Sequence, residues 1–299
     1  MNKTAKVKRN NLCFVIISTA LLTIYSILIL YPMIWAFFSS FKSRLDFLYN
    51  PEGFPKDLYG GWQFVNYSTA FRVLFVSVST SAGGTRPVYY PEMLLNAVIY
   101  TVGCTFVSLF SHTVRSYIAS RYKTVVSKIL YGMVIVVMAL PIVGSMPSEV
   151  QMTRALGLYD NLIGVCILKG GFATMNFLIL YASFKAIPSD YSEAASLDGA
   201  GHFRILGSIM LPMVKNSLIA IALLSAINYW NDYTTVGVFL PTHPTVTFGL
   251  YRFQYSFQPE SIIPVIIAAS LISCLPVLAL FLVFRNKILG AVMMGGLKG

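Results

Sequence analysis

Charged residues are scarce in this sequence: they make up 11% of 299 residues, whereas a soluble domain carries about 25%. The mean hydropathy is +0.70, and 56% of the residues are hydrophobic. A chain with so few charges cannot cover a water-facing surface of its own, so most of it must lie in lipid or in a helical bundle within lipid. The composition therefore predicts an all-α polytopic membrane protein with a single domain over residues 1–299, without a separate soluble catalytic domain.

Residues that carry catalytic or metal chemistry are also few. The three histidines are scattered, which predicts no metal site, and no nucleophile–base pair is visible. No G-x-x-x-x-G-K-[ST] phosphate loop is present, so any ATP hydrolysis that drives this protein must occur in another chain. The cysteines lie singly in apolar runs without a C-x-x-C, which favours small core hydrophobes over disulfides or metal ligands. They are Cys13, Cys104, Cys166 and Cys274.

Long apolar runs are present instead. A bilayer is crossed by about 20 apolar residues, and the first run is too long and too aromatic to be a signal peptide. Lys169-Gly170-Gly171 interrupts the fourth run, where we expect a break or bend, and Pro141 predicts a kink in the third. The predicted spans are 12–38, 94–113, 129–145, 162–184, 218–240 and 262–284.

The basic residues predict the orientation of these spans. In the predicted topology, both termini, the link after the second span and residues 188–212 lie inside. The acidic and basic residues of the outer segments then cancel, and the inner segments carry the whole formal charge of +11. Counting Lys and Arg in short loops near the span ends favours the same orientation. Both termini are therefore expected in the cytoplasm, and the basic excess requires no nucleic-acid partner. The link after the second span holds Arg115, Arg121, Lys123 and Lys128.

Residues 188–212 are the longest stretch with recurring charge between the later spans. Pro188 ends the preceding span, Ser189 is a good helix N-cap, and two acids follow in the first turn, where they suit the helix dipole. Gly199 can end this helix, and a second short helix is expected over 202–208. The pattern predicts a helix–turn–helix on a membrane surface.

The same stretch carries a spaced motif. It reads Glu193-Ala194-Ala195, three residues, Gly199, nine residues, Ile209, one residue and Leu211-Pro212. This pattern resembles the EAA loop of the membrane subunits of binding-protein-dependent ABC importers. Asp198-Gly199-Ala200 resembles the carbohydrate branch, the maltose and multiple-sugar type permeases. The alternative interpretation of this stretch is an ordinary amphipathic cytoplasmic loop.

The resemblance implies a type I ABC importer permease with six transmembrane helices, moving a sugar or oligosaccharide across a bacterial or archaeal cytoplasmic membrane. It implies a second homologous permease, two ATPase subunits that bind ATP and Mg, and an extracytoplasmic sugar-binding protein, with lipid around the chain. It also implies a coupling helix seated in a cleft of the ATPase. The residues assigned to coupling are Glu193, Ala194, Ala195, Asp198, Gly199, Ala200, Ile209, Leu211 and Pro212.

Two charges inside predicted spans mark a second candidate site. A charge at the bilayer centre costs about 2.5–3.5 kcal/mol, so Lys169 and Asp232 should line the translocation path or pair with each other. Lys169 could also snorkel to the outer interface. Asp232 adjoins a polar–aromatic cluster of the kind that binds sugars and that resembles the family's fifth-helix signature; packing between helices is the alternative. The remaining cluster residues are Asn228, Tyr229, Trp230 and Asn231.

Several alternatives stay open. Glu193 either pairs with an arginine of a partner or only stabilises its own helix, by about 0.3–1 kcal/mol. The outer stretch Val76–Pro91 either caps the outer face, contacts a binding protein or is a solvated connector. Trp62 with Asn66-Tyr67 resembles an element that related permeases carry before their second helix. The alternative function is a secondary active transporter of a small polar solute, which would require internal repeats and proton-relay carboxylates; one such acid and no clear repeat are found.

Overall fold

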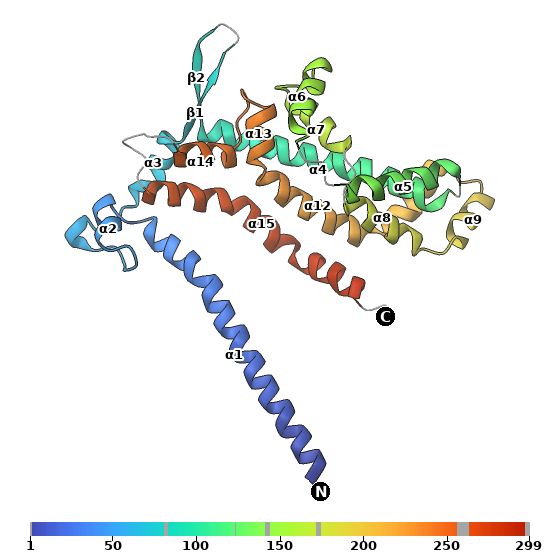
Figure 1. Ribbon diagram of the computed structural model, residues 1–299, viewed down its shortest axis with the longest axis horizontal. Coiled ribbons are helices and arrows are strands. Elements are labelled where there is room, and N and C mark those ends of the chain that lie inside the picture. Colours follow the sequence, from blue (N-terminus) through green and yellow to red (C-terminus); the bar gives the residue numbers. More distant parts are fainter. Residues whose placement is uncertain are drawn as a thin grey trace. The chain divides into compact units, whose positions relative to one another are not determined.

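The chain divides into two compact units. The computed structural model describes residues 2–80, 83–122, 124–140, 144–171, 175–255 and 263–296, with side chains from Phe14 to Arg285. The first unit comprises Met1–Val73 with Ser256–Ile272, and the second comprises Leu74–Tyr255 with Ser273–Gly299. Helices predominate in both, as the composition predicts, and their labels follow Figure 1.

The first unit contains the long helix α1 (Asn2–Ser39), followed by α2 (Arg44–Tyr49), the 3-10 turn η1 (Asp57–Tyr59) and α3 (Val65–Val73). Residues Phe14–Ser39 of α1 are long and apolar enough to cross a membrane, in agreement with the first predicted span. None of the apolar window in this helix is buried within the chain. Its sides therefore need an apolar environment, such as lipid or other membrane helices.

A buried polar cluster closes the turn after α1. The Lys42 side chain is fully buried, and its Nζ donates to the carbonyls of Asn50 (2.6 Å) and Pro51 (2.9 Å). Burial lowers the pKa of Lys42. The Asn66 side-chain amide donates to the carbonyls of Ser40 and Lys42, at 2.8 and 2.9 Å. Asn66 of the permease-like element thus holds the main chain of this turn.

The second unit begins with a β-hairpin, which the all-α prediction missed. Strand β1 (Phe75–Ser79) pairs antiparallel with β2 (Thr85–Tyr89), and Phe75 lies opposite Tyr89. The hairpin projects away from the helices and leads directly into α4 (Tyr90–Arg121) (Figure 1). Alternating burial of the β1 side chains, with valines inward and serines outward, explains why a stretch without a helical period forms a strand.

Helix α4 is the centre of the second unit. It packs against α7 (Leu162–Gly171), α8 (Met175–Lys185) and α12 (Lys215–Trp230) (Figure 1). It runs well beyond the predicted span 94–113, so Arg115 and Arg121 lie in the helix rather than in a link. The helix can continue because both guanidinium groups find main-chain carbonyl acceptors on α7 and α8.

The later spans differ in detail from the prediction. The break expected at residues 169–171 does not fall on these residues, which are helical as the last part of α7; α7 and α8 are bent by 57° relative to each other. The predicted span 218–240 is not a single helix, because α12 ends at Trp230 and a separate helix, α13 (Tyr233–Phe239), follows. Pro141, where a kink was expected, lies outside the described residues. The remaining helices are α5 (Val125–Ala139), α6 (Met146–Ala155), α14 (Val246–Tyr255) and α15 (Ile263–Gly296).

Within the described ranges, three helices are long and apolar enough to cross a membrane, or up to five segments when each bent pair counts as one. The three are Phe14–Ser39, Tyr90–Arg121 and Ile263–Arg285. Helix α5 is apolar but has only 15 residues, shorter than the roughly 20 that a straight crossing needs. The structure therefore agrees with a polytopic membrane protein.

Candidate functional site

The loop between α8 and α12 folds as the predicted helix–turn–helix, and its first helix is α9 (Asp190–Leu197). Its first turn carries Asp190 and Glu193, where carboxylates are favoured by the helix dipole. The expected side-chain cap from Ser189 is wrong: Ser189 is already helical in backbone, and its carbonyl accepts the Glu193 N–H at 3.0 Å.

The turn after α9 depends on the backbone of Gly199. Its φ is +78°, a left-handed conformation that L side chains rarely adopt. The Gly199 N–H donates to the Ser196 carbonyl at 3.1 Å and the Ala200 N–H to the Ala195 carbonyl at 2.9 Å. This pair of bonds is a Schellman motif, and Ala195 and Ala200 pack in one apolar cluster behind it. The prediction that Gly199 ends the first helix is confirmed.

The second helix is longer than the expected 202–208. It runs from His202 to Met213 as α10 (His202–Ile205), a π-helical turn η2 (Leu206–Met210) and α11 (Leu211–Met213). Pro212 has no N–H to donate into the preceding turn, and the wider π-helical turn stands directly before it. The next helix, α12, departs at 79° from this one.

The motif residues divide between two faces of the helix–turn–helix. An inner face packs on an apolar cluster around Phe184, Ile187 and Met210. An outer face is exposed and carries two large apolar side chains, Leu197 (89% exposed) and Phe203 (93% exposed). The inward motif residues are Ala195, Ala200, Ile209 and Leu211, and the exposed ones are Glu193, Ala194, Asp198, Gly199 and Pro212.

A pocket of about 670 Å³ lies between the end of α4 and the helices α9 and α10. The Tyr122 hydroxyl and His202 Nδ1 form a hydrogen bond of 2.9 Å at its wall. Hydroxyl groups, charges of both signs and the apolar side chains of Leu197 and Ile205 line this space. Its lining includes Tyr117, Arg121, Tyr122, Glu193, Ser196 and His202.

The two charges inside predicted spans form an ion pair. Lys169 Nζ lies 3.3 Å from Asp232 Oδ2 and donates to the Thr235 hydroxyl at 2.8 Å. The Tyr100 hydroxyl donates to the same carboxylate at 2.9 Å, and Asp232 Oδ1 accepts the Thr235 N–H as the N-cap of α13. The side chains are 21% and 19% exposed. Of the alternatives open from the sequence, pairing is the one that the structure shows.

The polar–aromatic cluster is split by the structure. Trp230 is only 6% exposed, and its Nε1–H donates to the Ser273 carbonyl on α15 at 3.2 Å. Asn228 and Asn231 are exposed, and the Asn231 amide donates to the Ile227 carbonyl at 2.8 Å. Trp230 therefore packs within its own unit, and the two asparagines are left as surface groups.

Comparison with known proteins identifies the family of this chain. Residues 113–289 match the family model of the binding-protein-dependent transport system inner membrane component, which covers more than half of the sequence and the whole helix–turn–helix. The chain belongs to this family. It is therefore a membrane permease subunit and not an enzyme, as the sequence predicted, and the secondary-transporter reading is set aside.

Similar proteins match nearly the full length of the permease. The diacetylchitobiose uptake system permease protein NgcG of Streptomyces coelicolor is 27% identical over 94% of this chain and 88% of its own. The maltodextrin transport system permease protein MdxG of Bacillus subtilis is 24% identical over 100% of both chains. Among solved structures, a chain of a bacterial ABC transporter involved in import of the acidic polysaccharide alginate superposes with a TM-score of 0.76, at 25% identity over 93% of the permease and 97% of that chain.

Two arginines of the permease have a structural role that sequence reasoning missed. Arg115 donates to the carbonyls of Gly170 and Gly171 at the end of α7, at 2.8 and 3.2 Å. Arg121 donates to the carbonyl of Phe184 at 2.8 Å, near the end of α8. Each therefore caps a helix C-terminus. In the sequence they are basic residues that follow a predicted span, and they cannot be distinguished there from the basic residues that set membrane orientation.

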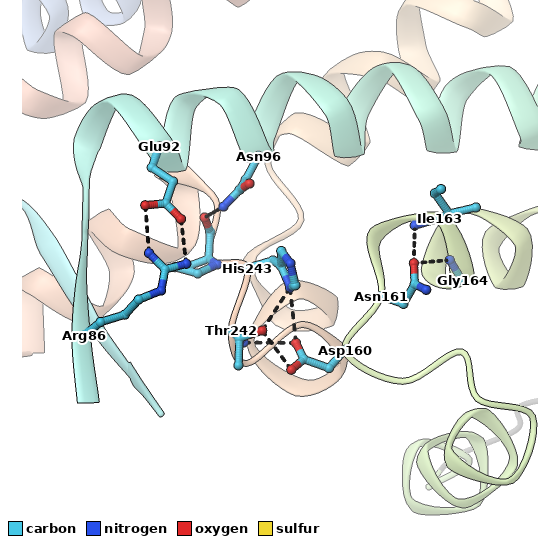
Figure 2. A network of polar contacts seen from close by, with 10 residues as sticks. Arg86, Glu92, Asn96, Asp160, Asn161, Ile163, Gly164, Thr242 and His243 are labelled. Carbon is cyan, nitrogen blue, oxygen red and sulfur yellow. Dashed lines mark hydrogen bonds and ion pairs between the residues drawn. The ribbon is translucent and has the colours of Figure 1, made fainter. Parts of the chain in front are cut away.

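A polar network on the loops before α7 and α14 was also missed. Asp160 has a φ of +55° and accepts both the N–H and the hydroxyl of Thr242, at 3.0 and 2.8 Å. His243 Nδ1 lies 3.4 Å from the same carboxylate (Figure 2). Beside it, Arg86 and Glu92 form a two-bond pair that ties the hairpin to α4 (Figure 2). The contacts of Asp160 with Thr242 and His243 link segments far apart in sequence, so no local sequence pattern predicts them.

Proposed function

We propose that the permease carries a sugar or oligosaccharide across the cytoplasmic membrane as one subunit of an ATP-driven importer. The support is the full-length similarity to permeases whose names state diacetylchitobiose and maltodextrin, and to a transporter for alginate. All three named cargoes are built from sugar units. A chain of this composition offers no large soluble surface for chemistry, so the substrate crosses unchanged.

The proposed assembly contains a second, related permease, two ATPase subunits with ATP and Mg, and an extracytoplasmic sugar-binding protein. The long apolar surface of α1 is suited to lipid or to packing against a membrane partner. We further propose six spans with both termini cytoplasmic. The support is the charge distribution, together with α5, the bent pair α7–α8 and α12 as the three crossings beyond the three long helices.

The observation that carries the proposal is the outer face of the helix–turn–helix. Leu197 and Phe203 expose almost their entire side chains, although charged residues surround them and lipid does not suit such a loop. Exposed apolar groups rimmed by polar residues mark a protein interface. Glu193, which is also exposed, supplies a charge for a basic partner group, and the exposed Ala194 allows close approach. We assign this face to the ATPase, with α9 as the coupling helix.

The transport path is proposed at the exposed asparagines. Asn228 and Asn231 offer amides to sugar hydroxyls from the C-terminal end of α12. Lys169 and Asp232 satisfy each other and hold α7 against the start of α13, so their role is to shape the path and not to bind cargo. Trp230 supports the same helix end from within the unit.

The experiment is reconstitution of the complete importer with substitutions on the outer face. Phe203→Ser and Leu197→Ser should lower sugar-stimulated ATPase activity and the amount of ATPase that co-purifies with the permease. Leu58→Ser is the matched control, because Leu58 is also apolar and 83% exposed but lies in the other unit, beyond the proposed outer end of α1. Wild-type stimulation and stoichiometry in both Phe203 and Leu197 variants would show that this face does not contact the ATPase.

A further inference from the structure

We propose that Arg121 is the positioning residue that pins both ends of the coupling loop, residues 188–212, to helix α4. The inference rests on the proposed function, since it assigns a mechanical role within the same permease. It concerns how movement of the loop reaches the membrane helices and not which surface the ATPase contacts.

The first contact of Arg121 is at the start of the loop. Its Nη2 donates to the carbonyl of Phe184 at 2.8 Å and to the carbonyl of Ile187 at 2.9 Å. Helix α8 ends at Lys185, so these are carbonyls of its last turn and of the residue next to Pro188. Carbonyls at a helix end lack partners in their own helix, and a cation is the favoured group there.

The second contact is at the end of the loop. The same Nη2 lies 3.6 Å from the sulfur of Met210, in the π-helical turn η2. Met210 is fully buried and belongs to one apolar cluster with Ile187, Ala195 and Ile205. One guanidinium therefore touches the chain where it enters the helix–turn–helix and where it leaves.

The position of Arg121 connects this pin to the membrane helices. It is the last residue of α4, the helix that packs against α7, α8 and α12. Its Nε is buried, without a hydrogen-bond partner among the described residues. The orientation of the side chain therefore favours the contacts of Nη2 with the loop ends and leaves the Nε–H without a hydrogen bond. A displacement of the loop must either move the end of α4 or break these bonds.

Arg115 provides a matched comparison on the same helix. It also caps a helix end, through the carbonyls of Gly170 and Gly171, but that helix is α7, and α8 separates α7 from the loop in sequence. Both arginines stabilise α4 against a neighbour by the same chemistry. The bonds of Arg121 reach the two ends of the coupling loop, whereas the bonds of Arg115 to Gly170 and Gly171 reach α7, so loss of Arg121 should disconnect the loop from the spans.

The test compares Arg121→Met with Arg115→Met in the complete importer reconstituted in liposomes. The readout is sugar moved per ATP hydrolysed, because a merely structural defect lowers the amount of active complex without changing this ratio. We expect Arg121→Met to lower the ratio about 5-fold or more, the size of a modest coupling free energy, while Arg115→Met keeps it. Arg121→Lys, which keeps the charge but loses the planar fork, should fall between wild type and Arg121→Met.

The possible outcomes separate the two proposals. A wild-type complex without sugar-stimulated ATPase activity would overturn the proposed function itself. A working wild type with an unchanged ratio in Arg121→Met, or an equal loss in Arg115→Met, would overturn only the role of Arg121. Should Arg121→Met fail to assemble, Arg121→Lys decides: a lowered ratio supports the pin, and a wild-type ratio refutes it.

Discussion

The ion pair between Lys169 and Asp232 should contribute to the free energy of unfolding of the permease. A double-mutant cycle should measure this contribution as an interaction free energy between the two residues. At 3.3 Å, two unit charges attract by about 5 kcal/mol at an effective dielectric of 20, before the loss of solvation is subtracted. Both side chains keep about a fifth of their exposure, so a net coupling of about 1–3 kcal/mol is expected. The perturbation is the cycle of Lys169→Met, Asp232→Asn and the double variant.

The partners of each residue set the order of the single effects. Lys169→Met leaves the carboxylate with the Tyr100 hydroxyl and the Thr235 N–H, so about 2 kcal/mol should be lost. Asp232→Asn removes the countercharge of the ammonium, which among the described residues keeps the Thr235 hydroxyl as an acceptor, and about 3–5 kcal/mol should be lost. Asparagine still caps α13, which separates the charge effect from the cap; Asp232→Ala should lose about 1 kcal/mol more.

The assay is reversible unfolding of the purified permease in mixed micelles, followed by tryptophan fluorescence. The double variant should be more stable than Asp232→Asn alone, because removing both charges leaves none unpaired in the apolar interior. Single losses that add to the double loss within about 0.5 kcal/mol would show that the two charges do not interact, and the ion pair could then not explain their presence in spans.

The other predictions concern the coupling loop and the topology. Gly199→Val should lower complex stability or coupling, because a side chain at φ +78° costs about 1–2 kcal/mol even though no atom lies within 4 Å of the added Cβ. Gly201→Val is the control: its Cβ is equally uncrowded, its φ is −70°, and it should behave as wild type. Glu193→Gln should preserve assembly with the ATPases, since an exposed pair contributes under about 1 kcal/mol, whereas Glu193→Lys should reduce sugar-stimulated ATPase activity; equal activity of the two would exclude a basic partner there. In a variant without native cysteines, an impermeant thiol reagent should label Ser79→Cys on intact cells and Ser189→Cys only after lysis, and the reverse pattern would invert the topology.

Much of this protein could be predicted from its sequence because the bilayer restricts the choices. In lipid, main-chain groups must be satisfied internally, so long apolar runs become helices, and the long apolar helices at Phe14–Ser39 and Ile263–Arg285 follow from composition alone. The helix–turn–helix was predictable for a local reason. A left-handed glycine and two acids in a first turn act over a few residues, and Gly199 ends α9 as expected.

Tertiary structure decided where partners come from distant segments. Arg121 looks like any cytoplasmic positive charge until the end of α8 and Met210 lie beside it. Trp230 looks like a sugar platform until α15 covers it and accepts its N–H. The pairing of Lys169 with Asp232 joins residues that only the packing of α7 against the start of α13 brings together. The sequence limits the roles that each residue can have. Contacts with residues distant in the chain determine its burial and its hydrogen-bond acceptors, and these determine which role it has.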